Sequence, residues 1–313
     1  MTNRVRQDEL EASLARLRAL VRDPRAGIFG PDSIVWEVAR EAAIFLGAGR
    51  AALLQLAHPY VAVAISEHSI TLDDPQRRFQ NTFRRIFRMV FGDLEEAIGA
   101  ARDVFRTHVR VRGTIAHHAG PFEKGHRYDA RDREAAVWVL ATLWDTSLWL
   151  FDRVVRPLSL AEKERYYEES RRFALLFGVE GSLPPSYAAF EAYVAGMLDA
   201  DVLTVTDEAR RIGSFIMRPQ NVLGRVVRDD YGVFTAHLLP ERLGRSFGLA
   251  RGGADGEKRF NRVLRAAHLA VPRLPERVRF LPSYIEAQRR MRGESGRDRL
   301  GEWMTRLYLG DDS

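Results

Sequence analysis

The amino-acid sequence predicts an all-α fold built as a single large helical domain. Apolar residues recur every three or four positions in most segments, for example at Leu10, Leu14 and Leu17, which is the spacing of one helix face. Helix-start signals precede several of these segments, as in the capping box of Ser159 and Glu162. No series of alternating strands and helices, no repeat and no low-complexity linker interrupts the pattern, so neither a parallel sheet nor a repeat array is expected.

The N-terminal part of the chain predicts an amphipathic helix, a buried helix and then a break at a proline. An amphipathic helix is expected over residues 8–21, and Asp23-Pro24 ends it. A second helix, capped by Asp32 or Ser33, is expected to continue toward Leu46 and to be buried, since it is apolar on almost every side. His58-Pro59 then interrupts the helical pattern, because a residue before proline avoids the helical conformation.

The central part of the chain holds the most informative pair of helices. Asp74-Pro75 predicts a helix start, and Arg78 and Thr82 follow on one face beside the apolar stripe of Phe79, Phe83, Ile86 and Val90. In the next helix His108 follows Leu94, Ile98, Ala101 and Phe105 at helical spacing. A histidine in line with core positions is either a core residue bonded to a backbone carbonyl or an axial metal ligand. The spacing alone favours neither reading.

The remaining chain continues the helical pattern. A long helix rich in tryptophan is expected over 134–155, followed by shorter helices separated by proline and glycine. We expect an N-terminal helix and turn over residues 1–30, the main helical domain over 31–291, and a C-terminal helix and tail over 292–313 packed on that domain.

Composition excludes several kinds of chemistry. The 313 residues include no cysteine, which rules out disulfides, thiolate ligation of iron, thioether-bound haem and iron–sulfur clusters. The net charge of +6 comes from arginines interleaved with acids, so a nucleic-acid partner is not expected. No apolar run reaches the roughly 20 residues of a spanning helix, and the charged N-terminus does not resemble a signal peptide. We expect a soluble, cytoplasmic protein.

Two further motifs have weak signals. Gly47, Gly49 and Ala52 imitate a dinucleotide-binding fingerprint with Glu67 as its acid, but the preceding residues favour a helix and no strand is expected there. These glycines would instead let a flat ligand or another helix approach the backbone. Glu67 could serve as a general base, although a surface or capping role is equally open. A zinc site is not expected in the loop of His117, His118 and His126, which lacks zinc-ligand spacing.

Several stretches in order resemble the DUF2236 family, which contains the rubber oxygenase (latex clearing protein) catalytic domain and the mpaB-type oxygenases. The resemblance extends in patches from Ile34 to Met291. It is carried by "AHPYVAVAISEHSITLDDPQRRFQNTFRRIFRMVFG", "THVRVRG", "YDARDREAAVWVLATLWDTSLWLF", "SLPPSYAAFEAYVAGML" and "LLPERLGRSFGL". The ordered series is far more specific than any one stretch.

The resemblance implies non-covalent haem b in a pocket between buried central helices. It also implies use of dioxygen on an apolar, isoprenoid-like or unsaturated-lipid-like substrate, with cleavage of a carbon–carbon double bond. By position, His108 matches the family's proximal haem ligand, and Arg78 and Thr82 match polar residues near the haem. Asn81 stands where rubber oxygenase has a lysine that can occupy the distal iron site.

Other residues are candidates on physical grounds. Arg112 lies four residues after His108 and would hold a haem propionate from the same side of the helix. Gly49 and His58 are further candidates for the pocket wall, although a kink alone explains the context of His58. Arg78 is open to a propionate role or a role beside bound oxygen. A helical protein that binds haem or an apolar ligand without chemistry is the alternative function.

Overall fold

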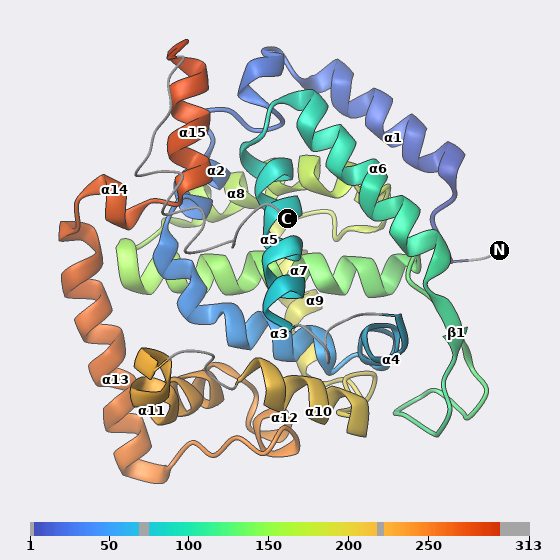
Figure 1. Ribbon diagram of the computed structural model, residues 1–313, viewed down its shortest axis with the longest axis vertical. Coiled ribbons are helices and arrows are strands. Elements are labelled where there is room, and N and C mark those ends of the chain that lie inside the picture. The colour runs from blue at the N-terminus through green and yellow to red at the C-terminus, as the bar shows by residue number, and fades with distance from the viewer. Residues whose placement is uncertain (1–2, 69–74, 218–221, 295–313) are drawn as a thin grey trace.

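The protein folds almost entirely into helices, which confirms the predicted fold class (Figure 1). The structure is a computed structural model that describes residues 3–68, 75–217 and 222–294, with the backbone alone for 75–80 and 222–229. Its α-helices are α1 (Gln7–Leu20), α2 (Ile34–Ala39), α3 (Ala48–Leu56), α4 (Pro59–His68), α5 (Pro75–Phe91), α6 (Leu94–Arg110), α7 (Arg133–Leu150), α8 (Leu160–Leu175), α9 (Tyr187–Asp199), α10 (Asp207–Ile216), α11 (Val222–Leu238), α12 (Glu241–Ser246), α13 (Gly253–Ala270), α14 (Glu276–Arg279) and α15 (Pro282–Met291).

Short tight helices and one hairpin complete the described chain. The 3-10 helices are η1 (Pro24–Ala26), η2 (Ala42–Gly47), η4 (Glu180–Ser182) and η5 (Val271–Arg273), and a π-helical turn η3 (Phe151–Val155) extends α7. Strands β1 (Arg112–Thr114) and β2 (Arg127–Asp129) pair antiparallel, with Arg112 opposite Asp129. The sequence had indicated only a loop there, because strands this short carry no detectable alternation.

Helix α7 is the central element of the core. It crosses the middle of the molecule behind α5 in Figure 1 and packs against α3, α8 and α9. Asp132 caps it by accepting a hydrogen bond of 2.9 Å from the Ala135 N–H. Trp138 is fully buried, and its indole Nε1 donates to the carbonyl of Leu54 at 3.0 Å. The polar end of this large side chain is therefore satisfied inside the core.

The helix expected to continue toward Leu46 instead ends at Ala39, so that prediction is wrong. Ser33 caps α2 as expected, accepting from the Trp36 N–H at 3.1 Å. Just beyond that end, the fully buried Glu41 side chain pairs with the partly buried Arg279 through hydrogen bonds of 2.8 and 2.7 Å, which holds the chain away from the helix path. A partner 238 residues away cannot be recognised from local spacing. The chain then continues through η2 into α3.

The N-terminal helix shares the main core. Leu10, Leu14 and Leu17 of α1 are buried in the same cluster as the side chains of α7 and α8, which confirms the predicted amphipathic face. The break expected at His58-Pro59 is also present, between the end of α3 and the start of α4. The division at residues 30 and 291 stays a prediction, and residues 295–313 lie outside the described chain. No helix among the described residues has the length and apolar character needed to cross a membrane.

Candidate functional site

A large apolar cavity lies between α5 and the central helices. The centres of water-sized molecules can occupy about 290 Å³ of this cavity. Its whole empty volume, including the part open to solvent, is about 1580 Å³. Its walls come mainly from α3, α5 and α7, with further contributions from η2, α2, α8 and α10 and a single residue from α4. Such an enclosure, large and mostly hydrophobic, is typical of a site for an apolar small molecule or cofactor.

Aromatic rings form the wall between η2 and α5. The ring of Phe45 lies 4.8 Å from that of Phe83 and 6.1 Å from that of Phe87, measured between centroids. Ile86, Val90 and Phe91 continue the wall along α5. Of the stripe predicted on this helix, Phe83, Ile86 and Val90 face the cavity, whereas the side chain of Phe79 lies outside the described part of the structure.

The described walls of the cavity carry no charged side chain and no histidine. Their polar members are Gln55, Thr82, Thr146, Ser147 and Tyr166. Gln55 donates from Nε2 to the Thr142 hydroxyl at 3.0 Å, and Thr146 Oγ1 accepts from Arg50 Nη1 at 2.5 Å. Burial raises the pKa of Tyr166, so its phenol stays protonated near neutral pH. A ligand in this cavity would be held by its shape and by apolar contacts, with a few hydrogen bonds available.

The predicted polar residues of α5 lie at one edge of this cavity. Thr82 lines the edge and is exposed, and Asn81 beside it is half buried. Arg78 lies one helical turn before Thr82, but its side chain is outside the described part of the structure, as is Asp74. Thr82 therefore borders the apolar wall formed by Phe83 and Ile86, and the placement expected for Arg78 stays a prediction.

Helix α6 places His108 near its C-terminal end. Asp93 and Glu96 form a capping box at the start, and Leu94, Ile98 and Ala101 are buried on one face. Phe105 and His108 continue this face and are half buried. The helix packs against α5, but His108 is not among the residues that line the cavity.

Arg112 is not one helical turn beyond His108, so that expectation is wrong. Helix α6 ends at Arg110, Val111 has an extended backbone, and Arg112 is the first residue of β1. Strand geometry turns successive side chains to opposite faces, so the helical spacing no longer relates the two side chains. Arg112 is exposed.

Gly47 and Gly49 allow neighbouring helices to approach closely. A Cβ atom at Gly47 would lie 2.4 Å from Thr146 Cγ2, and one at Gly49 would lie 2.9 Å from Thr235 Oγ1. The Gly49 N–H also donates to the Tyr231 hydroxyl at 3.0 Å. Gly47 lines the cavity, whereas Gly49 faces α11. Of the two roles expected for these glycines, helix packing is the one seen.

Proton donors and acceptors gather where α4 meets the β-hairpin. This hairpin cluster consists of Tyr60, Glu67, His68, His126 and Tyr128. Tyr128 donates to Glu67 Oε2 at 2.5 Å and lies 2.9 Å from His68 Nε2, and the Tyr60 hydroxyl lies 2.7 Å from His126 Nε2. Burial and the Glu67 carboxylate raise the pKa of Tyr128.

Glu67 is therefore an acceptor within the hairpin cluster. A Cβ atom at Gly113 would lie 3.0 Å from Glu67 Oε2, so this carboxylate sits close against β1. Its Oε2 atom accepts the Tyr128 hydrogen bond, and the side chain is exposed, so a general-base role for Glu67 stays a prediction. Among residues 3–68, 75–217 and 222–294, no three metal-binding side chains are grouped to hold an ion.

His58 lies beside the hairpin cluster and away from the cavity. It is buried, and its ring contacts those of Tyr60 and Phe122, with centroids at 5.2 and 6.0 Å. Burial lowers the pKa of His58 to about 4. The Tyr60 N–H donates to His58 Nδ1 at 3.3 Å, which places the ring proton on Nε2.

Sequence reasoning missed most of the cavity wall. Gln55, Ser147 and Tyr166 come from three helices that are distant in the sequence, and nothing in their local spacing marks them. A signal was available only for Gln55, a polar residue within the apolar run of α3. Tyr166 was predicted only as part of a helix.

Comparison with known proteins gives one match. Residues 36–306 match the family described as ER-bound oxygenase mpaB/B'/Rubber oxygenase, catalytic domain. Searches of curated proteins and of solved structures gave no match.

Proposed function

Because this chain belongs to the family of mpaB and rubber oxygenase catalytic domains, we propose that it is a haem b-dependent oxygenase. Its substrates would be dioxygen and an apolar, isoprenoid-like or unsaturated-lipid-like molecule, and the reaction the cleavage of a carbon–carbon double bond. The uncharged cavity between α3, α5 and α7 carries this proposal. Insertion of both oxygen atoms of one dioxygen yields two carbonyl groups, so the reaction needs no external reductant.

The chain offers the groups that a haem requires. A haem needs an apolar slot, at least one axial donor and cations for its propionates. The cavity supplies apolar walls of suitable extent. The axial donor must come from outside the described walls, because those contain no histidine, lysine or methionine. Tyr166 is a poor candidate, since burial disfavours the phenolate that would bind iron.

Five of the eight histidines are engaged elsewhere by contacts unrelated to the cavity. His68 and His126 bond to tyrosine hydroxyls, His117 and His118 lie 3.5 and 3.4 Å from carboxylates, and His268 bonds to a backbone carbonyl. A sixth, His237, stacks on Phe260 and lies 3.1 Å from the Arg251 carbonyl. None of these six histidines lines the described walls of the cavity.

His108 matches the family's proximal haem ligand by position, and the hydrogen bond that His58 accepts disfavours His58 as an alternative. A haem ligand binds through one ring nitrogen while the other donates its N–H to an acceptor. His58 Nδ1 faces an N–H donor instead, so binding iron through Nε2 would require the other tautomer and the loss of that bond. We therefore propose His108, half buried on α6 beside α5, as the proximal ligand.

The rim of the cavity would supply the polar contacts for catalysis. Bound haem would supply the binding and activation of dioxygen. Thr82 offers a hydroxyl at the cavity edge, and Arg78 on the preceding turn offers a guanidinium fork that suits a developing negative charge. We assign both residues to the oxygen or substrate side. The apolar walls would exclude water and hold the substrate chain.

The alternative is a protein that binds haem or an apolar ligand without catalysing a reaction, because an apolar cavity can bind such a ligand whether or not a reaction follows.

Two measurements test these functions. The absorption spectrum of the purified protein, with and without dithionite, reports haem. Dioxygen consumption with a detergent-dispersed polyisoprenoid or polyunsaturated lipid, compared with the carbonyl groups formed, reports the reaction. One dioxygen per two carbonyls is expected. A haem-loaded protein that consumes no dioxygen with any such substrate would support the alternative.

A further inference from the structure

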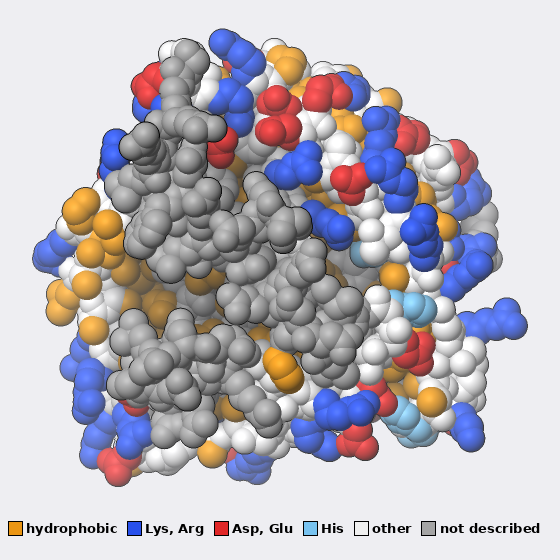
Figure 2. All heavy atoms as spheres, viewed as in Figure 1, with side chains coloured by type: hydrophobic (Ala, Val, Ile, Leu, Met, Phe, Trp, Pro, Cys, Tyr) orange, Lys and Arg blue, Asp and Glu red, His pale blue; other side chains and the backbone are white. Residues whose placement is uncertain are grey.

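An exposed apolar surface lies where α13 turns into α14. We call residues 269–278 the α13–α14 elbow. Its Leu269, Leu274 and Val278 side chains are 59%, 40% and 52% exposed. Figure 2 shows hydrophobic side chains gathered at the left edge of the molecule, where Figure 1 places α14 and the end of α13. Exposed aliphatic side chains in such a group indicate a contact surface.

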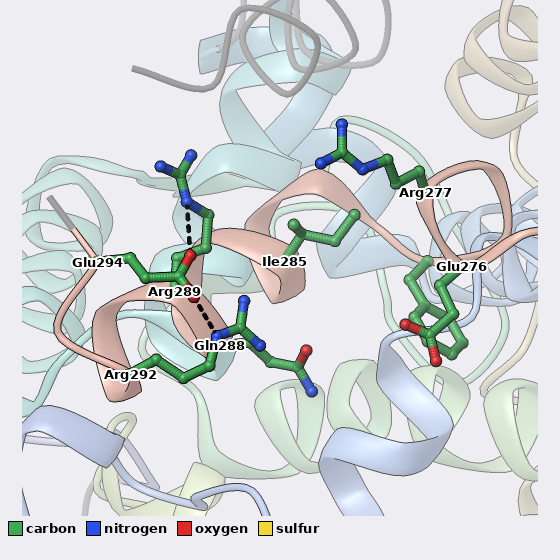
Figure 3. Close-up of a pocket in the computed structure, with 8 residues that line it drawn as sticks. Glu276, Arg277, Ile285, Gln288, Arg289, Arg292 and Glu294 are labelled. Carbon is green, nitrogen blue, oxygen red and sulfur yellow. Dashed lines mark hydrogen bonds and ion pairs between the residues drawn. The ribbon is translucent and has the colours of Figure 1, made fainter. Parts of the chain in front are cut away.

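Unpaired arginines surround the elbow. Arg262, Arg265 and Arg277 are exposed, and none forms an ion pair with a residue that the structure describes. Figure 3 shows the contrast within one region, since Arg289 and Arg292 meet Glu294 whereas Arg277 extends away from them. Arg279 is different because the buried Glu41 neutralises it. The elbow itself contains one acid, Glu276.

A groove connects the elbow with the wall of the cavity. It measures about 540 Å³ and is lined by Leu274 and Val278 of the elbow, by Val271 and Ala267, and on the opposite side by η2. Phe45 of η2 lines both this groove and the internal cavity. Residues 42–46 are all half buried, as expected for a thin wall between two openings. A 3-10 helix of six residues is unusually long and has weaker hydrogen bonds than an α-helix.

We propose that the α13–α14 elbow docks on an anionic lipid surface and so places the groove against the bilayer. Exposed aliphatic side chains beside arginines match the two properties of such a surface, an apolar interior and negatively charged headgroups. A second copy of the chain fits less well, because a two-fold contact would set the arginines of one copy against those of the other. Nucleic acid would match the charge but leave the aliphatic side chains without a partner.

Docking would give an apolar substrate a direct route from the lipid to the groove and the Phe45 wall. That consequence rests on the proposed oxygenase function, whereas docking itself does not. It also explains why an enzyme for water-insoluble substrates would keep leucine and valine exposed beside unpaired arginines.

Co-sedimentation of the full chain with lipid vesicles tests the proposal. The chain should bind vesicles of phosphatidylcholine with phosphatidylglycerol, and binding should weaken as salt rises. Arg265→Gln/Arg277→Gln should lower the partition coefficient about thirtyfold, since each arginine near an anionic surface contributes about fivefold. Leu269→Ser/Leu274→Ser/Val278→Ser should lower it about tenfold through lost apolar contact.

Matched variants control for general effects. Leu20→Ser/Leu160→Ser removes two equally exposed leucines elsewhere, and Arg22→Gln/Arg110→Gln removes two exposed arginines elsewhere; both should bind as the parent does. Equal binding to neutral vesicles, no binding, or an equal loss in the control variants would overturn the proposal. A dimer in sedimentation that the triple serine variant dissociates would also overturn it, in favour of a second copy. Dioxygen consumption with detergent-dispersed substrate is independent of docking, so it still tests the oxygenase.

Discussion

The cavity and the hairpin cluster are built from opposite kinds of side chain, although one helix borders both. The described cavity walls are apolar, with a few hydroxyls and one amide. The hairpin cluster links two tyrosines, two histidines and a carboxylate through hydrogen bonds. In α4, Ile65 lines the cavity while Glu67 belongs to the cluster. Apolar and hydrogen-bonding side chains thus gather in separate regions that meet along α4.

Because of this separation, a proposed iron ligand has to come from outside the described cavity walls. The described walls of the cavity contain no histidine, whereas His68 and His126 belong to the hairpin cluster. His108 lies on the last turn of α6, the helix that leads into β1. The following predictions test whether residues outside the described cavity walls serve a cofactor in the cavity, beginning with the largest expected effect.

The largest effect is expected from loss of His108. His108→Ala should abolish haem binding, because it removes the proximal donor, so its Soret band should be absent after expression with ample haem. His58→Asn should keep a normal band, since Asn Oδ1 can still accept from the Tyr60 N–H. Haem content by absorption and by pyridine haemochrome checks both. If the His58 variant loses haem and the His108 variant keeps it, the ligand assignment is wrong and the hairpin side supplies the iron donor.

His58 should instead control stability in acid. Its pKa is lowered to about 4 in the folded protein by burial, against about 6.5 in the unfolded chain. Between these values the unfolded state binds more protons, so the free energy of unfolding falls as pH drops from 6.5 to 4. The total loss is roughly 3 kcal/mol at 1.36 kcal/mol per pKa unit.

Urea unfolding between pH 4.5 and 7.5 measures this effect. The parent should lose stability relative to His58→Asn as pH falls, because asparagine does not titrate. His118→Asn serves as the control, since His118 is exposed and its removal should leave the slope unchanged. Parallel curves for the parent and His58→Asn would show that His58 is not buried in its neutral form.

A feature of this arrangement is predictable from the sequence when the residues that determine it are close together in the chain. Helix α6, its capping box and the face that leads to His108 were predictable, because residues three and four apart determine them. The end of α2 was not, since the Glu41–Arg279 pair joins residues from opposite ends of the chain. The cavity belongs to the second kind, because its walls meet only through tertiary packing. Family resemblance indicated Arg78, Thr82 and His108 but could not place them relative to one another.

An intermediate effect is expected at the cavity rim. Arg78→Ala should lower turnover per bound haem about a hundredfold, since loss of one transition-state donor typically costs about 3 kcal/mol. Thr82→Val keeps the shape of the side chain and removes only the hydroxyl, so its effect should be smaller. Arg85→Ala, at an exposed position on the same helix, is the control. An Arg78→Ala protein that is active per haem but mostly empty would make this residue a propionate anchor.

The smallest effect concerns Asn81, which is half buried beside Thr82. An asparagine amide is short and a poor donor to iron, whereas a deprotonated lysine amine on its flexible stem is a strong one. We therefore expect the ferric protein to bind imidazole or cyanide readily, with a shift of spin state on adding either. Asn81→Lys should slow cyanide binding and move the spectrum toward six-coordinate low spin. Asn81→Gln, which lengthens the side chain without an amine, should leave both unchanged. A parent protein that is already low spin and refuses external ligands would mean that another side chain caps the iron, and His68 of the hairpin cluster would then be the first to replace.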